Sequence, residues 1–66
     1  MNKMQKLIEE YGVTDGHAAK ILGVSPGAVS DWKSGHRPIP QYIENSIDIH
    51  ISIPKKQRNR IKEMTK

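Results

Sequence analysis

Two short helical patterns follow one another within residues 15–34, and only three residues separate them. In the first, the N-cap residue Thr14 precedes an apolar set that ends at Leu22. The second begins at Ser25–Pro26, where serine supplies the capping oxygen and proline loses only an N–H that would have no partner. Between them, Gly23 can adopt the positive φ that a sharp turn requires. This arrangement predicts a helix-turn-helix.

Small and apolar residues fall where two such helices would touch. Ala19 is small enough for a close approach, and Val29 and Trp32, at i and i+3, are expected to face inward with Val24. Alanine, glycine four positions later, valine six after that and tryptophan three beyond form a fairly specific signal for this motif. An αα-hairpin that uses the same residues only for packing is the alternative.

With Val29 and Trp32 turned inward, the second helix presents mostly short side chains on its outward face. Such a face would let the helix sit deep in a DNA major groove, which is about 12 Å wide. Asp31 can accept a hydrogen bond from a cytosine amino group, or it is an ordinary surface carboxylate. No Arg, Asn or Gln lies on this face, so we expect modest direct readout and a larger share from backbone contacts and DNA shape. The predicted base-contacting residues are Pro26, Gly27, Ser30, Asp31 and Ser34.

Phosphate contacts are expected around the rim of this face. The N-terminus of the first helix of the motif offers free N–H groups and the positive end of a helix dipole. Basic side chains just beyond the second helix can reach the flanking backbone, with plain solvation as the alternative for Arg37 and Lys20. The three histidines share no metal-ligand spacing, so neither a metal nor another cofactor is expected. The predicted phosphate-contacting residues are Thr14, His17, Lys20, Lys33, His36 and Arg37.

The remaining segments extend the helical pattern. Apolar residues at i, i+3, i+4 and i+7 predict a first helix that stops at Gly12, and apolar residues at i, i+4 and i+8 predict a fourth helix from Ile43 to Ile51. Within residues 47–53, isoleucine also alternates with polar residues, which is a strand pattern. We favour the helix because the chain offers no second strand, although pairing across a dimer would rescue the strand. Pro54 opens a basic fifth helix.

The predicted fold is therefore all-α, a compact bundle of four or five helices in one domain spanning residues 1–66. Its helix-turn-helix core lies at 15–34 and its C-terminal helices at 40–64. A domain of about 60 residues buries only about 60% of its unfolded surface, and the chain has no cysteine for disulfides. We therefore expect a homodimer. The predicted dimer interface is formed by Tyr42, Ile49 and Ile53, unless these residues complete the monomer core.

Charge is unevenly distributed along the chain. The whole chain carries a formal net charge of +4, with +5 on residues 54–66 and −1 on residues 1–53. A basic segment on a small domain indicates a polyanionic partner, such as nucleic acid or an anionic membrane surface, with a solvated helix face as the alternative. Apolar runs are too short for a transmembrane span or a signal peptide, so a cytoplasmic location is expected.

The run AAKILGVSPGAVSDWKSG, at the heart of residues 13–37, resembles the helix-turn-helix of phage Cro and CI-type (lambda-repressor-like) repressors. The segment RPIPQYIENSI, followed by proline and a basic helix, is similar to short prophage regulators of that superfamily. The resemblance implies a two-fold dimer that binds a pseudo-palindromic operator near its own promoter. It also implies a C-terminal half that is either helical or replaced by strands. Pro26 and Gly27 depart from the family, which often carries Gln or Ser there, so the resemblance does not extend to the usual glutamine–adenine contact.

The predicted function is sequence-specific DNA binding by a dimeric, autoregulating repressor in a bacterial cell or phage-infected host. Alternatives are a protein-interaction or antitoxin-like module, or an architectural, excisionase-like protein. An enzyme is not expected, because the sequence has no cysteine, no paired carboxylates at helical spacing and no glycine-rich phosphate loop. No membrane partner or small-molecule ligand is expected.

Overall fold

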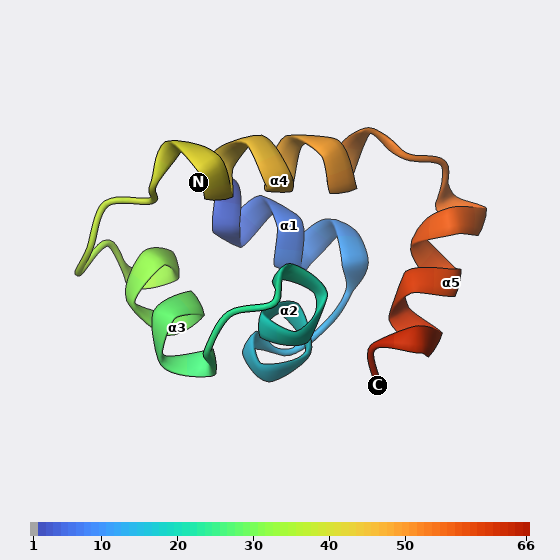
Figure 1. Cartoon of the computed structure of the whole chain (residues 1–66), viewed down its shortest axis with the longest axis horizontal. Coiled ribbons are helices and arrows are strands. Elements are labelled where there is room, and N and C mark those ends of the chain that lie inside the picture. The colour runs from blue at the N-terminus through green and yellow to red at the C-terminus, as the bar shows by residue number, and fades with distance from the viewer. Residues whose placement is uncertain (1) are drawn as a thin grey trace.

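The computed structural model describes residues 2–66, and within that range the chain forms five α-helices and no strand (Figure 1). The radius of gyration is 10.8 Å. The predicted all-α bundle of four or five helices is therefore confirmed. The helices are α1 (Lys3–Tyr11), α2 (Asp15–Leu22), α3 (Pro26–Ser34), α4 (Gln41–Ser52) and α5 (Lys55–Met64).

Local capping chemistry sets where the first three helices begin. Asn2 and Gln5 form a capping box at the start of α1, in which each side chain satisfies the other residue's backbone N–H. Thr14 and Ser25 cap α2 and α3 by accepting hydrogen bonds from the backbone N–H groups three residues later, as their sequence positions predict. Gly23 ends α2 with a φ of 72°, which allows the sharp turn into α3.

One apolar core joins the helices. α1 contributes three of the most buried side chains and packs against α4, α3 and α2, while α2 and α3 pack closely against each other. In Figure 1, α4 runs along the top, α1 lies beneath it, and α2 and α3 form the lower part of the molecule. The buried core residues are Met4, Leu7, Tyr11, Ala18, Ala19, Val29, Trp32, Ile43 and Ile47.

The alternative of a strand at residues 47–53 is wrong, because this segment continues α4 as far as Ser52. Ile43 and Ile47, one helical turn apart, both face the core, whereas Ile49 is 64% exposed. A strand would have turned Ile47 and Ile49 to the same side of the chain. The helical period of the apolar positions therefore outweighs the alternation of isoleucine with polar residues.

The Arg58 side chain attaches α5 to the rest of the bundle. Its guanidinium donates hydrogen bonds to the carbonyl oxygens of Ile53 (3.1 Å) and Ile51, pairs with Glu10 at 3.3 Å and lies 5.7 Å from the centre of the Tyr11 ring. The final carbonyls of an α-helix have no partner within the helix, so Arg58 both caps α4 and positions α5.

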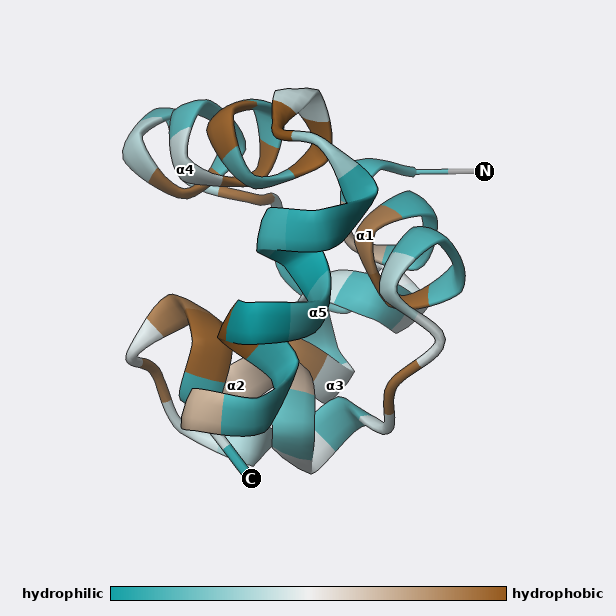
Figure 2. Cartoon of the chain, turned by 90° about the vertical axis from the view of Figure 1, so that its right-hand side faces the viewer, coloured by the Kyte–Doolittle hydropathy of each residue, from teal (hydrophilic) through white to brown (hydrophobic). Residues whose placement is uncertain are grey.

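α5 lies against α1 and α2 and contributes no fully buried residue. Figure 2 shows it in front of these helices with a predominantly hydrophilic surface. Across residues 2–66, no helix combines the length and the apolar character that a membrane crossing would require.

Candidate nucleic-acid interface

α3 has a sharp division between its inner and outer faces. Val29 is fully buried and Trp32 is 6% exposed, as the sequence predicts. The predicted base-contacting residues occupy the other side: Pro26, Gly27, Ser30 and Ser34 are exposed, and Asp31 is half-buried. A convex helical face of short side chains therefore lies on the surface next to the first turn of α2, to which the Lys33–Asp15 pair joins it.

Asn2 and Gln5 hold the C-terminal end of α3 in place. The Asn2 side-chain amide donates to the carbonyl oxygens of Trp32 at 2.9 Å and Lys33 at 3.2 Å, and the Gln5 amide donates to the Lys33 carbonyl at 2.9 Å. The capping box of α1 thus also satisfies free carbonyls at the end of α3. The Asn2-x-x-Gln5 spacing is a capping signal for α1, but nothing in the sequence indicates that these side chains also contact the end of α3.

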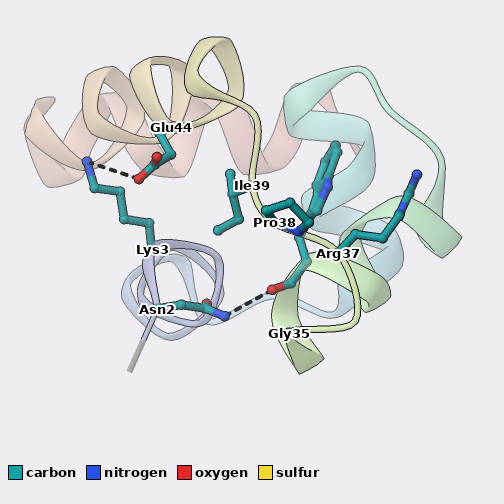
Figure 3. Close-up of a pocket in the computed structure, with 8 residues that line it drawn as sticks. Asn2, Lys3, Gly35, Arg37, Pro38, Ile39 and Glu44 are labelled. Atoms are coloured by element: carbon teal, nitrogen blue, oxygen red, sulfur yellow. Dashed lines mark hydrogen bonds and ion pairs between the residues drawn. The ribbon is translucent and has the colours of Figure 1, made fainter.

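A hollow of about 530 Å³ lies beside this anchor, between the start of α1, the end of α3 and the start of α4. Figure 3 shows Asn2 reaching toward the end of α3, with Pro38 and Ile39 lining the wall and Arg37 extending away along it. Lys3 lies on the opposite rim, 3.9 Å from Glu44 and 2.8 Å from Asp48. The hydrogen bond and charge of Asp48 raise the pKa of Lys3 above its usual value.

The Asp31 carboxylate is paired. Arg37 Nε lies 3.1 Å from Asp31 Oδ2, and the Arg37 guanidinium lies 5.8 Å from the centre of the Trp32 ring. Ser34 Oγ donates to the Asp31 carbonyl at 3.3 Å and lies 2.7 Å from His36 Nδ1. Asp31, Ser34, His36 and Arg37 therefore form one polar cluster at the C-terminal end of the exposed α3 face.

The other predicted phosphate-contacting residues lie around α2. Thr14 Oγ1 is engaged as the N-cap of α2, and Lys20 is exposed in its last turn. Lys33 Nζ lies 3.0 Å from Asp15 Oδ1, which links α3 to the first turn of α2. Arg37, 54% exposed at its side chain, and the exposed His36 extend this set beyond α3.

His17 is turned toward α5. Its Nε2 lies 3.0 Å from the Lys62 carbonyl oxygen and 3.0 Å from Thr65 Oγ1. A carbonyl oxygen only accepts, so Nε2 carries the hydrogen in this arrangement. The sequence predicted a phosphate contact for His17, whereas its ring joins α2 to the end of α5. Sequence spacing contains no signal for this contact, since 45 residues separate His17 from Lys62.

The cations of α5 differ in their surroundings. Arg58 contacts the end of α4 and Glu10. Lys66 pairs with Glu63 at 2.9 Å, and the hydrogen bond and charge of Lys66 lower the pKa of Glu63. Lys55, Lys56 and Arg60 are exposed, and Lys62 is half-buried. The helix therefore presents a cationic surface over most of its length.

The three residues predicted for a dimer interface are not equally accessible. Tyr42 is 70% and Ile49 is 64% exposed, and they lie seven residues apart, on one side of α4. Ile53 is half-buried at the end of α4, and its carbonyl accepts from Arg58. The structure thus leaves an apolar pair on the outer surface of α4.

Among residues 2–66, no cluster of three His, Asp or Glu side chains is arranged to hold a metal ion. The arrangement offers instead an exposed helix face, free N–H groups at a neighbouring helix start and several cations. No protein family, curated protein or solved structure matches this chain.

Proposed function

We propose that this protein is a helix-turn-helix transcriptional regulator that binds double-stranded DNA through the major groove. In this proposal α2 and α3 are the two helices of the motif, and α3 is the reading helix. The protein acts as a homodimer on a pseudo-palindromic operator and represses its own gene. It is thus a small regulator of the kind found among phage Cro and CI-type repressors.

The observation that carries the proposal is the exposed face of α3. Pro26, Gly27 and Ser30 are short and exposed, while Val29 and Trp32 fix the helix from behind. A helix with such a face can approach the floor of a major groove closely, and serine hydroxyls can exchange hydrogen bonds with base edges. The hydrogen bonds from Asn2 and Gln5 restrain α3 in the free protein, so less conformational entropy is lost when α3 binds DNA.

The surrounding charges support the same proposal. Arg37 and His36 follow α3 directly, and Lys20 is exposed on α2. The positive charges of Arg37 and Lys20 flank the reading helix, where the phosphate backbone would pass. The pair between Arg37 and Asp31 offsets the one carboxylate on the predicted base-contacting face.

A DNA titration tests this function. The full chain is titrated with the duplex immediately upstream of its own gene and with a scrambled duplex of equal length, each at several salt concentrations. We expect the upstream duplex to bind at least about 10³-fold more tightly, with a footprint of two protomers. Weak binding of both duplexes with the same salt dependence would overturn the proposal, because only counterion release would then remain.

A protein-interaction module is the second candidate, and the exposed Tyr42 and Ile49 favour it. These side chains would contact a different protein, as in an antitoxin. DNA affinity that requires a protein partner would support this candidate over the self-sufficient repressor.

A further inference from the structure

Two contacts fix the two ends of α5. Near its start, Arg58 binds the last carbonyls of α4. Near its end, His17 of α2 binds the Lys62 carbonyl and Thr65 Oγ1, each at 3.0 Å. No α5 side chain is fully buried, so the half-buried Ile61, which packs against the core, and these polar contacts together hold the C-terminal turn in place.

The contact with His17 is specific in its chemistry. Thr65 Oγ1 donates to the Ile61 carbonyl at 2.6 Å, so the hydroxyl hydrogen is already used and its oxygen is available to accept from His17 Nε2. His17 is the third residue of α2, in the turn whose backbone N–H groups have no partner within the helix. The C-terminal turn of α5 is thereby held beside the N-terminal turn of α2.

This placement brings two further cations to the lower side of the molecule. Lys62 lies in the last turn of α5, and Lys66 follows the end of the helix, where it pairs with Glu63 at 2.9 Å. Figure 1 shows the C-terminal end of α5 on the same lower side as α2 and α3, with α2 between α3 and α5. Lys55 and Lys56 lie at the other end of α5, next to α4 and about 10 Å away along the helix axis.

We propose that the C-terminal turn of α5 and the residues that follow it bind the DNA phosphate backbone through the side chains of Lys62 and Lys66. His17 is the positioning residue that holds this turn in place. The inference rests on the proposed function and extends the binding surface from the two helices of the motif to a third. Its occupant is DNA because Lys62 and Lys66 outweigh the charge of Glu63 and this end of α5 lies on the same side of the molecule as α2 and α3 (Figure 1).

Salt dependence tests the proposal on the full chain. The variant Lys62→Gln/Lys66→Gln is compared with Lys55→Gln/Lys56→Gln, which removes the same charge from the opposite end of the helix. The variant removes two phosphate contacts from each protomer, four from the dimeric complex, which lowers the slope of log affinity against log salt by about 3.6. Between about 50 and about 200 mM salt, the affinity of the first variant should therefore fall about 10²-fold less than that of the wild type.

The Lys55/Lys56 variant should keep the wild-type slope. Equal slopes for both double variants and the wild type would overturn this inference while leaving the proposed function intact. An equal reduction of the slope in both variants would also overturn it, because that result would show that only the total charge of the chain affects the slope. If the wild type itself binds no duplex specifically, both proposals fail.

His17 is tested by the same measurement. His17→Ala should lower the slope as the lysine variant does, whereas His17→Gln, whose amide can donate to the Lys62 carbonyl, should restore it. Thermal unfolding establishes that each variant is folded. A His17→Ala variant that is folded, yet keeps the wild-type slope, would overturn the positioning role.

Discussion

The Asp31 carboxylate lies 3.1 Å from Arg37 Nε, and the same guanidinium lies over the ring of Trp32. Asp31 is the only acidic residue within α3, and Arg37 comes from the segment that follows it. The pair therefore places a positive charge against the one negative charge on the predicted reading face. An unpaired carboxylate there would repel DNA phosphates.

This relationship predicts a coupled effect of Arg37 and Asp31 on DNA affinity. Arg37→Ala should weaken binding to all sequences alike, because it removes a cation and leaves Asp31 unpaired. In an Asp31→Asn background, the same change should cost less affinity, since no carboxylate is left exposed. A double-mutant cycle measured by DNA titration checks this coupling. Exposed ion pairs contribute about 1 kcal/mol or less to folding, so the variants should remain folded. Strictly additive losses of affinity would contradict the prediction.

Ser30 predicts a change in sequence preference. Its exposed hydroxyl lies at the middle of the α3 face, so Ser30→Ala should alter the bases selected from a random duplex library while general affinity changes little. Ser52→Ala, at the exposed end of α4, serves as the matched control and should select the wild-type sequence. If Ser30→Ala also selects the wild-type sequence, the reading face lies elsewhere.

The parts of the fold that depend on local chemistry follow from the sequence. Thr14, Ser25 and Gly23 mark helix ends through hydrogen bonds and backbone angles within a few residues, and the structure has the helices where these signals predict them. The burial of Val29 and Trp32 also follows from helical spacing alone. The strand alternative arose because isoleucine at residues 47–53 satisfies both periods, and only the burial of Ile43 and Ile47 on one face distinguishes them.

The contacts that position the candidate site depend on packing between distant segments. Asn2 contacts the end of α3 thirty residues later, and His17 contacts α5 across 45 residues. The direction of each side chain depends on how the helices cross, which spacing within one helix does not specify. The contact of Arg58 with α4 also depends on packing. A basic residue soon after a helix can cap its carbonyls. The sequence, however, does not distinguish Arg58 from the five other basic residues in residues 54–66.

Asn2 predicts a separation between the stability of α1 and the placement of α3. Asn2→Ser keeps an N-cap oxygen for α1 but removes the amide that reaches the Trp32 and Lys33 carbonyls. We expect a loss of about 1 kcal/mol in the free energy of unfolding and a measurable loss of DNA affinity. Asn2→Ala should cost about 1 kcal/mol more, because it also removes the cap. Urea unfolding and DNA titration check both values, and equal stability of the two variants would contradict the separation.

The outer surface of α4 predicts the effect of a charge at Ile49. Ile49→Glu should weaken the dimer while leaving helicity unchanged, since Ile49 is 64% exposed and lies outside the core. Gln57→Glu, which adds the same charge at an exposed position of α5, is the control and should preserve the dimer. Sedimentation equilibrium measures the association, with circular dichroism for helicity. An Ile49→Glu protein that stays dimeric at micromolar concentration would place the interface elsewhere.

Tyr11 predicts how stability depends on alkaline pH. Burial raises the pKa of its phenol above the usual value of about 10, against the opposing charge of Arg58. The folded state therefore holds the phenol proton to higher pH than the unfolded state does, and stability decreases as pH rises above about 10. Tyr11→Phe removes the hydrogen bond to the His50 carbonyl, so its free energy of unfolding should be about 1 kcal/mol lower at neutral pH. Above about pH 10, its free energy of unfolding should decrease less steeply than that of the wild type.

Urea unfolding at several pH values between about 8 and about 11 measures this dependence. Tyr42→Phe, measured at a concentration where the protein is monomeric, is the matched control, because Tyr42 is 70% exposed and lies outside the core. That variant should follow the wild-type curve throughout, since all other titrating groups are shared by the three proteins. A Tyr11→Phe protein whose stability falls as steeply as that of the wild type would show that another group causes the alkaline loss.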